Sequence, residues 1–256
     1  MKSLSFVIPI YNESKRLHKT FEALQGGFSF SGIKLEKVIF VDDGSIDNTK
    51  DKIKRQKLKL KQILKAKIEV ISYPINRGKG YAVKQGMLAS DSDYTLFFDA
   101  DMSTPLSEFS KLMPHIQKQV DVLVGTRKNG HSTVVKHQPL YRELLGRGFT
   151  LISQLILNTW VTDFTCGFKA FSRTAKNEIF PLAQIERWSY DSEILYLGRM
   201  LGYKLQEVPV LWKNDEGTKV NLLKDIPKTL IDLISIRLSK YTVQSMVRPF
   251  VKRLAV

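Results

Sequence analysis

Two spacings of hydrophobic residues alternate along this chain. Short runs rich in β-branched and aromatic residues predict strands at 4–10, 37–41, 68–73, 94–98, 120–125 and 207–212. Apolar residues at helical spacing predict helices between them, at 13–24, 49–64, 81–89, 106–119, 141–158 and 189–201. Strands that alternate with helices predict an α/β fold, with a mostly parallel sheet and helices on both faces.

The C-terminal end of the chain follows a different pattern, so we expect a division into 1–215 and 216–256. One amphipathic helical face is predicted from Leu222, Ile226, Leu230, Leu233 and Ile234, and a second from Val243, Met246, Val247, Phe250, Val251 and Leu254. We expect the first face to pack over the sheet. For the second, which carries basic residues outside the apolar face, packing on the domain and lying in a membrane interface both stay open.

Polar residues gather where four of the predicted strands end. These clusters are Tyr11 with Glu13, Asp42 with Asp43, Arg77 with Lys79, and Asp99 with Asp101. The carboxyl ends of parallel strands lie along one edge of a sheet, which is where α/β proteins bind their ligands. We therefore expect the four clusters to converge on one site.

The pair Asp99 and Asp101 directly follows a buried apolar run. Two carboxylates one residue apart can ligate Mg²⁺ or Mn²⁺, which share their coordination shell with substrate phosphates. Taken alone, the pair also fits a polar turn that closes a strand. The neighbouring clusters favour a site, in which Lys79 would add a positive charge for a phosphate.

Charge narrows the choice of partner. The 256 residues include 40 Lys and Arg against 25 Asp and Glu, a net charge of +15, which indicates an anionic partner. Much of this charge lies at 50–67, where apolar residues at helical spacing favour a solvated helix face. No nucleic acid is expected, because aromatic residues for base stacking are not interleaved with these lysines.

Other features bound the class of protein. Cys166 is the single cysteine, which excludes an intrachain disulfide framework and a multi-cysteine zinc site, and we assign it no chemistry. The sequence contains neither a signal-peptide pattern nor an apolar stretch long enough to span a membrane. We expect a soluble or peripheral protein of the cytoplasm.

Several motifs resemble a known family. The segments PIYNE, VDDGSIDNT, NRGKGYAVKQGM, FFDADMSTP and GTR occur in the order typical of family 2 glycosyltransferases with the GT-A fold. The later segments RELLGRGF, DFTCGFKAF and ERWSYDSEILYL resemble polyprenyl-phosphate hexosyltransferases, above all the dolichyl-phosphate β-glucosyltransferase branch. The resemblance extends over about 4–212 and implies a GT-A domain at 1–215.

The resemblance also implies roles on the donor side. Pro9, Tyr11, Glu13 and Asp42 would line a nucleoside pocket. Asp99 and Asp101 would hold Mg²⁺ or Mn²⁺ and the diphosphate, so Asp99 counts with the nucleotide-binding residues, and Lys79 would lie near the nucleotide-sugar.

On the acceptor side, the resemblance points to arginines and acids. Arg127, Arg142 and Arg147 are the candidates for binding an acceptor phosphate, because guanidinium groups bind phosphates bidentately. Arg127 and Asp191 are the residues assigned to catalysis. Asp191 and Glu193 have an alternative role as acids that stabilise the first turn of a helix.

The implied activity is metal-dependent and inverting: a hexose, glucose first, moves from a nucleoside-diphosphate sugar such as UDP-glucose to a polyprenyl or dolichyl monophosphate. The alternative in the same family is a sugar-hydroxyl acceptor, which would need Asp191 or Asp163 as a base. A non-catalytic nucleotide or nucleic-acid binder is the remaining class. Because relatives often carry membrane-spanning helices, a lipid acceptor implies that this chain reaches an anionic membrane surface, on the cytoplasmic face, through its charge and its C-terminal segment.

Overall fold

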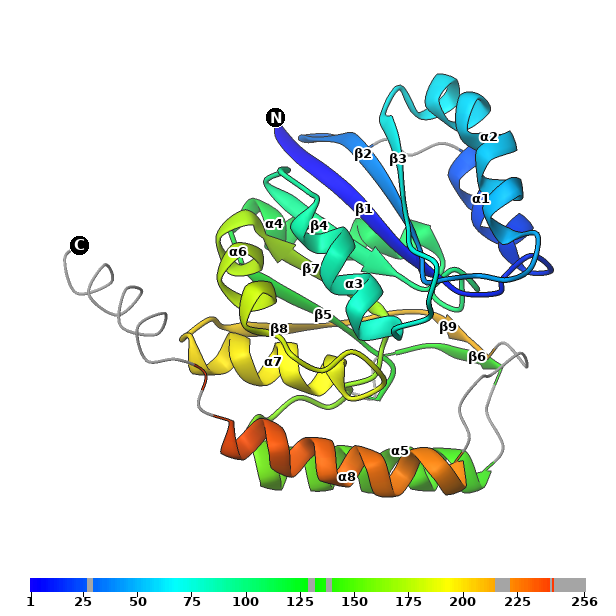
Figure 1. Ribbon diagram of the computed structural model, residues 1–256. Helices are drawn as coiled ribbons and strands as arrows, with labels where there is room; N and C mark the ends of the chain where they lie inside the picture. Colours follow the sequence, from blue (N-terminus) through cyan, green and yellow to red (C-terminus); the bar gives the residue numbers. More distant parts are fainter. Residues whose placement is uncertain (27–29, 129–131, 137–139, 215–221, 240, 242–256) are drawn as a thin grey trace.

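The computed structural model describes residues 1–26, 30–128, 132–136, 140–214, 222–239 and 241, and a seven-stranded sheet crosses its centre (Figure 1). The strands are β1 (Lys2–Ile10), β2 (Ile33–Asp42), β3 (Lys67–Ser72), β4 (Tyr94–Phe98), β5 (Val122–Thr126), β7 (Phe168–Ser172) and β8 (Leu205–Pro209). Their order is β3-β2-β1-β4-β7-β5-β8, and β7 alone runs antiparallel to its neighbours in this sheet of the described residues. The predicted α/β fold is confirmed.

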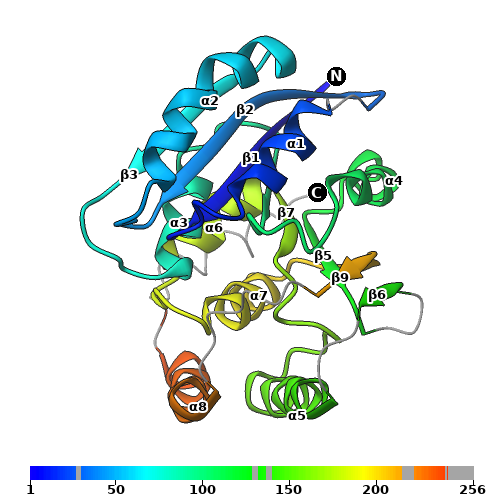
Figure 2. The ribbon, with the colours of Figure 1, turned by 90° about the vertical axis from the view of Figure 1, so that its right-hand side faces the viewer.

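Helices cover both faces of the sheet (Figure 2). They are α1 (Leu17–Gln25), α2 (Thr49–Leu64), α3 (Lys79–Leu88), the 3₁₀-helix η1 (Leu106–Lys111), α4 (Met113–Gln117), α5 (Leu140–Leu157), α6 (Arg173–Leu182), α7 (Tyr190–Met200) and α8 (Leu222–Leu238). One layer contains α1, α2, η1 and α4, and the opposite layer contains α3, α6 and α7. Helices α5 and α8 lie side by side beyond α7.

Alternation along β1 explains why both faces need cover. Phe6 and Ile8 belong to the core under α1 and η1, whereas Val7 belongs to the core under α3 and α6. All three side chains are fully buried. A strand that is apolar on both sides reads as a continuous hydrophobic run, which is the pattern seen in the sequence.

Some predicted elements were wrong in detail. The single helix expected at 106–119 is divided into η1 and α4, because Pro114 lacks an N–H group and suits the first turn of a new helix. A short strand that was not predicted, β6 (Val134–Lys136), pairs with β9 (Trp212–Lys213) in a small parallel sheet. Strand β7 and helix α6 were not predicted.

The C-terminal helix α8 packs against α5 and α7. Leu233 and Ile236 are buried in that contact, but Ile234 is 51% exposed, so the predicted packing of Ile234 was wrong. Ile234 lies about 100° around the helix from Leu233, which turns it away from α7. The side chains of Leu222 and Ile226, and the whole segment 243–254, lie outside the described residues. Among the helices described, none has the length and apolar character needed to cross a bilayer.

Candidate active site

A carboxylate in the turn after β2 fixes the loop that follows β3. The Asp43 carboxylate accepts hydrogen bonds from the backbone N–H groups of Arg77 and Gly78, both at 2.9 Å, and from Asn76 Nδ2 at 2.6 Å. A carboxylate that accepts backbone N–H groups fixes a loop through charge-assisted hydrogen bonds. Asp43 therefore brings the loop before α3 against the end of β2.

Asp42, which precedes Asp43 and was predicted to contact a nucleoside, faces a hollow in the surface. Its carboxylate accepts from Ser45 N at 3.2 Å and Ser72 Oγ at 3.0 Å. The hollow has a volume of about 210 Å³ and is lined by Asp42, Ser45, Lys50, Ser72, Tyr73 and Pro74. The hollow is polar with an aromatic wall and lies at the carboxyl ends of β2 and β3; the predicted contact of Asp42 with a nucleoside stays a prediction.

The other predicted nucleoside residues lie at the neighbouring end of β1. Pro9 is in β1, and Tyr11 follows it in a partly exposed position. Glu13 is buried and forms a bidentate pair with Arg16, at 2.8 Å to Nε and 2.7 Å to the terminal nitrogen. Because Glu13 N also donates to Thr49 Oγ1 at 2.9 Å, Glu13 ties the β1 end to α2. Its predicted contact with a nucleoside stays a prediction.

Lys79 joins the clusters at β3 and β4. Its Nζ lies 2.5 Å from Asp99 Oδ1, so the first turn of α3 is tied to the end of β4. Burial alone would lower the pKa of Lys79, but Asp99, Asp191 and Asp101 together raise it. The predicted convergence of the β3 and β4 clusters is confirmed, and Asp191 belongs to the same electrostatic neighbourhood.

Asp99 needs a glycine opposite it. A Cβ atom on Gly167 would collide with the Asp99 carboxylate, so no other residue fits there without displacing Asp99. The backbone N–H of Asp99 donates to Gly167 O at 3.2 Å, at the point where β7 begins beside β4. The DFTCGFK segment is thus physically attached to the carboxylate pair.

The carboxylate pair fits a hard divalent cation. Burial, and then the negative charge of Asp99, raises the pKa of Asp101, so a bound cation would relieve both effects. Asp101 Oδ1 accepts from Ser103 N at 2.9 Å, which orients the carboxylate. No group of three or more potential metal ligands occurs among the described His, Cys, Asp and Glu side chains. Diphosphate and water would complete the shell, as Mg²⁺ sites commonly require.

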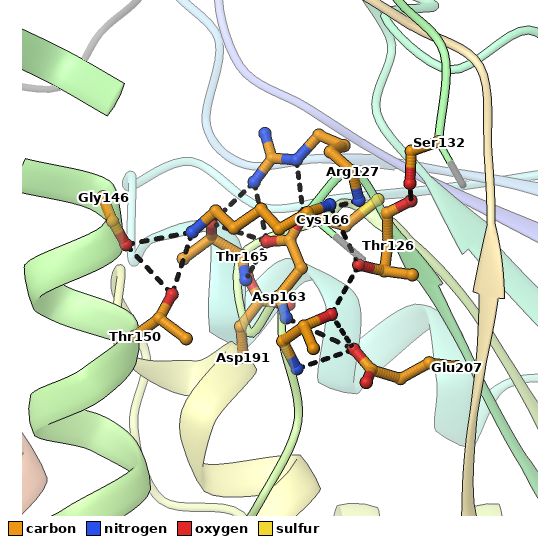
Figure 3. A network of polar contacts seen from close by, with 12 residues as sticks. Thr126, Arg127, Ser132, Gly146, Thr150, Asp163, Thr165, Cys166, Asp191 and Glu207 are labelled. Atoms are coloured by element: carbon orange, nitrogen blue, oxygen red, sulfur yellow. Dashed lines mark hydrogen bonds and ion pairs between the residues drawn. The ribbon is translucent and has the colours of Figure 1, made fainter. Parts of the chain in front are cut away.

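Across the sheet edge, Arg127 forms a bidentate pair with a fully buried carboxylate (Figure 3). Its Nε and a terminal nitrogen lie 2.6 and 2.8 Å from the two oxygens of Asp163, and its backbone N–H donates to the same carboxylate at 3.1 Å. Burial would raise the pKa of Asp163, but Arg127 holds it well below its usual range. The guanidinium also lies 5.1 Å from the ring centre of Trp212. Arg127 is therefore held in one orientation.

Lys128, a residue that the sequence analysis missed, follows directly. Its Nζ donates to Gly146 O at 2.9 Å and to Thr150 Oγ1 at 2.8 Å, both on α5 (Figure 3). Burial, despite the charge of Asp163, lowers the pKa of Lys128. Two consecutive basic residues therefore have different partners: Arg127 is paired with Asp163, and Lys128 contacts α5.

The two arginines predicted on α5 are placed less closely. Arg147 is exposed and near enough to Lys128 to lower its pKa, after burial and Arg127. The Arg142 backbone is helical, and its side chain lies outside the described part of the chain. Their acceptor-phosphate roles stay predictions.

Asp191 forms a buried ion pair that the sequence did not reveal. Lys169 Nζ lies 2.5 Å from Asp191 Oδ1 and 2.6 Å from Cys166 O, and Lys169 is fully buried in β7. Burial raises the pKa of Asp191, and Lys169 and Lys79 offset part of that effect. The only hint in the sequence is a lysine inside the apolar run of DFTCGFKAF. Cys166 is buried and its pKa is raised to about 12, consistent with the absence of assigned chemistry.

Glu193 has a structural partner set of its own. Its two oxygens accept from the N–H groups of Gln184 and Ile185, both at 2.8 Å, and Tyr241 Oη donates at 3.0 Å. In the loop that Glu193 holds, Glu186 O accepts a hydrogen bond from Tyr81 N at 3.0 Å. Glu193 thereby fixes the loop that packs on the first turn of α3, and that turn contains Lys79.

Comparison with known proteins gives the protein family to which this chain belongs. Residues 5–180 match the glycosyl transferase family 2. The match covers more than half of the chain, and the chain belongs to this family.

Individual relatives show which members of the family this chain is similar to. The dolichyl-phosphate beta-glucosyltransferase of Dictyostelium discoideum is 34% identical over 249 residues, covering 91% of this chain and 73% of that protein. The protein of the same name from Saccharomyces cerevisiae is 34% identical, with 92% and 74% covered. That from Homo sapiens is 31% identical, with 86% and 70% covered.

Solved structures share the fold. Glucosyl-3-phosphoglycerate synthase from Mycobacterium tuberculosis in complex with UDP aligns with a TM-score of 0.65 at 16% identity, covering 92% of this chain and 80% of that chain. A complex of the same enzyme with Mn²⁺, UDP and glucosyl-3-phosphoglycerate aligns equally well, at 17% identity and the same coverage. The predicted GT-A fold is thereby confirmed.

Proposed function

We propose that this chain is an inverting hexosyltransferase that moves glucose from a nucleoside-diphosphate glucose, UDP-glucose first, to a polyprenyl monophosphate such as dolichyl phosphate. The names of the relatives support the sugar and the lipid acceptor. The observation that carries the proposal is the position of Lys79. The carboxylates of Asp99 and Asp101 are near it on the donor side, and that of Asp191 is near it toward the acceptor side.

The reaction needs one displacement. An oxygen of the acceptor phosphate attacks the anomeric carbon, the bond from that carbon to the diphosphate breaks, and the nucleoside diphosphate leaves. A phosphate oxygen is already ionised near neutral pH, so no side chain has to remove a proton. Arg127 would hold the acceptor phosphate in line, since its orientation is fixed by Asp163 and needs no reorganisation.

Asp99 and Asp101 would hold Mg²⁺ or Mn²⁺, and the bound cation would stabilise charge on the diphosphate leaving group. Lys79 forms an ion pair with Asp99. When donor binds, Lys79 would be able to share its charge between Asp99 and a phosphate oxygen.

The contacts of Asp163, one of the two candidate bases, favour the phosphate acceptor over a sugar hydroxyl. Asp163 gives both oxygens to Arg127, and Asp191 is paired with Lys169. A hydroxyl acceptor would require one of these carboxylates to accept a proton. A carboxylate whose pKa is held low by an arginine, as for Asp163, is a weak base.

The test is transfer of radiolabelled hexose into the organic phase. Purified protein receives UDP-glucose, GDP-mannose or UDP-N-acetylglucosamine with polyprenyl phosphate, with Mg²⁺ or Mn²⁺ or with EDTA. We expect metal-dependent label in the lipid from UDP-glucose. Label that appears only on an added soluble sugar would replace this proposal with the hydroxyl-acceptor reaction.

Asp101→Asn is the first variant to assay. Since the metal would supply several kcal/mol of charge stabilisation, we expect kcat to fall by about 100-fold or more with the fold intact. Asp91→Asn, on a side chain that is 97% exposed, is the matched control and should leave kcat unchanged. A fully active Asp101→Asn enzyme would contradict the metal assignment.

A further inference from the structure

A carboxylate on strand β8 holds the segment that carries Asp163 (Figure 3). Glu207 Oε1 lies 2.8 Å from Thr162 N, 2.6 Å from Thr162 Oγ1 and 3.3 Å from Asp163 N. A carboxylate oxygen can only accept, so all three partners donate to it. Glu207 therefore fixes the backbone at the residue whose side chain pairs with Arg127.

The hydrogen bonds around Thr162 run in one direction. The Thr162 hydroxyl has a single proton, which it donates to Glu207, so Thr162 Oγ1 accepts from Thr126 Oγ1 at 2.8 Å. Thr126 Oγ1 in turn accepts from Lys128 N at 3.2 Å. Each hydroxyl thus donates one hydrogen bond and accepts one, and neither can rotate without losing a bond. The network ends at Glu207, which is its final acceptor.

Strand β8 fixes both partners of the ion pair on the acceptor side. It runs parallel to β5, with Glu207 opposite Val124, and Arg127 directly follows β5. The same strand holds Asp163 through the Glu207 side chain. The relative position of Arg127 and Asp163 therefore depends on one residue of β8.

The pair that depends on Glu207 has strict geometry. Asp163 gives one oxygen to Arg127 Nε at 2.6 Å and the other to a terminal nitrogen at 2.8 Å. Hydrogen bonds weaken steeply as their angles depart from linear, so a bidentate pair tolerates little displacement of either partner. Misplacing a group that holds a reactant by about 1 Å can cost about 100-fold in rate. A residue that fixes Asp163 can therefore affect the reaction without contacting a substrate.

We propose that Glu207 is a positioning residue for the acceptor phosphate: it fixes Thr162 and Asp163, and Asp163 orients Arg127. The proposal rests on the proposed function, in which Arg127 holds the phosphate of a polyprenyl acceptor. Glu207 contributes an acceptor oxygen to the donors of Thr162 and Asp163. Glutamine keeps such an oxygen, so it should replace Glu207, whereas a side chain of similar size without an acceptor should not.

The test compares four variants of the full chain. Glu207→Leu removes the acceptor, and Glu207→Gln keeps a carbonyl oxygen for Thr162. Gln206→Leu is the matched control, because it lies next to Glu207 in β8 with its side chain on the opposite face. Thr162→Val removes only the hydroxyl bonds and keeps the bond from Thr162 N, so it takes the place of Glu207→Leu if that variant does not fold.

The first measurement needs no substrate. The Nε–H group of Arg127 donates to Asp163, and heteronuclear NMR follows the exchange of its proton with solvent. In Glu207→Leu we expect this exchange to be about tenfold faster than in the wild type, because the bond opens more often. Glu207→Gln and Gln206→Leu should match the wild type. Exchange in Glu207→Leu equal to that of the wild type would overturn the positioning role.

The second measurement separates positioning from a general loss of structure. With a soluble isoprenyl monophosphate as acceptor, Glu207→Leu should lower kcat/KM for the acceptor about tenfold, and Thr162→Val about threefold. Glu207→Gln should restore the wild-type value. Binding of UDP-glucose, measured by calorimetry, should stay unchanged, because the donor-side carboxylates lie at the ends of β2 and β4. Equal losses in donor binding and acceptor kcat/KM would overturn the proposal.

A double-mutant cycle tests the route through Asp163. If Glu207 acts through this carboxylate, Glu207→Leu should lower kcat/KM much less in an Asp163→Asn background than in the wild type. A fully additive loss would overturn the proposal, because Glu207 would then act by another route. If the wild type transfers no sugar to the isoprenyl phosphate but the NMR result holds, the proposed function fails and the positioning of Arg127 by Glu207 stands.

Discussion

The two sides of the candidate site hold their charges differently. On the donor side, the ends of β2 and β3 are joined by Asp43, which accepts mainly from backbone N–H groups of the loop before α3. On the acceptor side, Arg127 pairs with Asp163 and Lys169 pairs with Asp191, and both acids are buried. Apart from the ion pair of Lys79 with Asp99, the donor side is a set of carboxylates in turns, whereas the acceptor side is a set of buried ion pairs between elements.

This difference predicts a difference in sensitivity. A buried ion pair loses little when both partners are replaced together, but it is costly when one charge is left without its partner. A carboxylate that caps a loop leaves neutral N–H groups behind when it is removed, which costs less. Single substitutions on the acceptor side should therefore affect stability more than those on the donor side.

Asp163→Ala should have the largest effect. It leaves the Arg127 guanidinium, on a side chain that is only 17% exposed, without its carboxylate, which we expect to cost about 3–5 kcal/mol in the free energy of unfolding. Urea denaturation followed by circular dichroism measures the loss. Asp91→Ala, at an exposed position, is the control, and an effect of Asp163→Ala no greater than that of the control would contradict the buried pair.

Asp43→Ala should destabilise less, by about 1–3 kcal/mol, because the N–H groups of Arg77 and Gly78 lose their shared acceptor. Since the same loop carries Lys79, we also expect weaker binding of the nucleotide-sugar, measured by calorimetry. A loss of stability equal to that of Asp163→Ala would remove the contrast between the two sides.

Lowering the pH should produce the smallest of these effects on stability. The pKa of Asp163 is lowered on folding, so the stability that it contributes is complete above its unfolded pKa, about 3.9, and is lost as the pH falls below that value. The difference in Tm between the wild type and Asp163→Asn should be constant from about pH 5 to 8 and narrow below about pH 4. A difference that stays constant down to the lowest pH at which both proteins fold would count against the pair.

The same contrast explains what the sequence could predict. Asp99 and Asp101 come just after β4, and Lys79 begins the helix that follows β3. The strand pattern and the parallel topology were therefore enough to predict that these two clusters converge. Asp163 comes 36 residues after Arg127, and Lys169 comes 22 residues before Asp191. Nothing in the local pattern says which distant charge neutralises a buried one, so these partners were not predicted.

The antiparallel strand β7 was missed for a related reason. It has five residues, includes the charged Lys169, and is inserted between β4 and β5 after a long excursion through α5. Its burial depends on both neighbours and on the partner of Lys169. The exposure of Leu151 and Leu155 on α5 also required the structure, because an apolar helical face looks the same in a sequence whether it packs or is exposed.

The insertion of β7 has a consequence for biosynthesis. The strands β3, β2, β1 and β4 are complete once residue 98 has been made, and each has a neighbour among the others. Strand β5 has only β7 and β8 as neighbours in the sheet, and both are translated later. While a ribosome is still adding the residues of α5, the nascent chain thus carries β5 as a strand without a partner, and the sheet closes only when Phe168–Ser172 emerges from the exit tunnel.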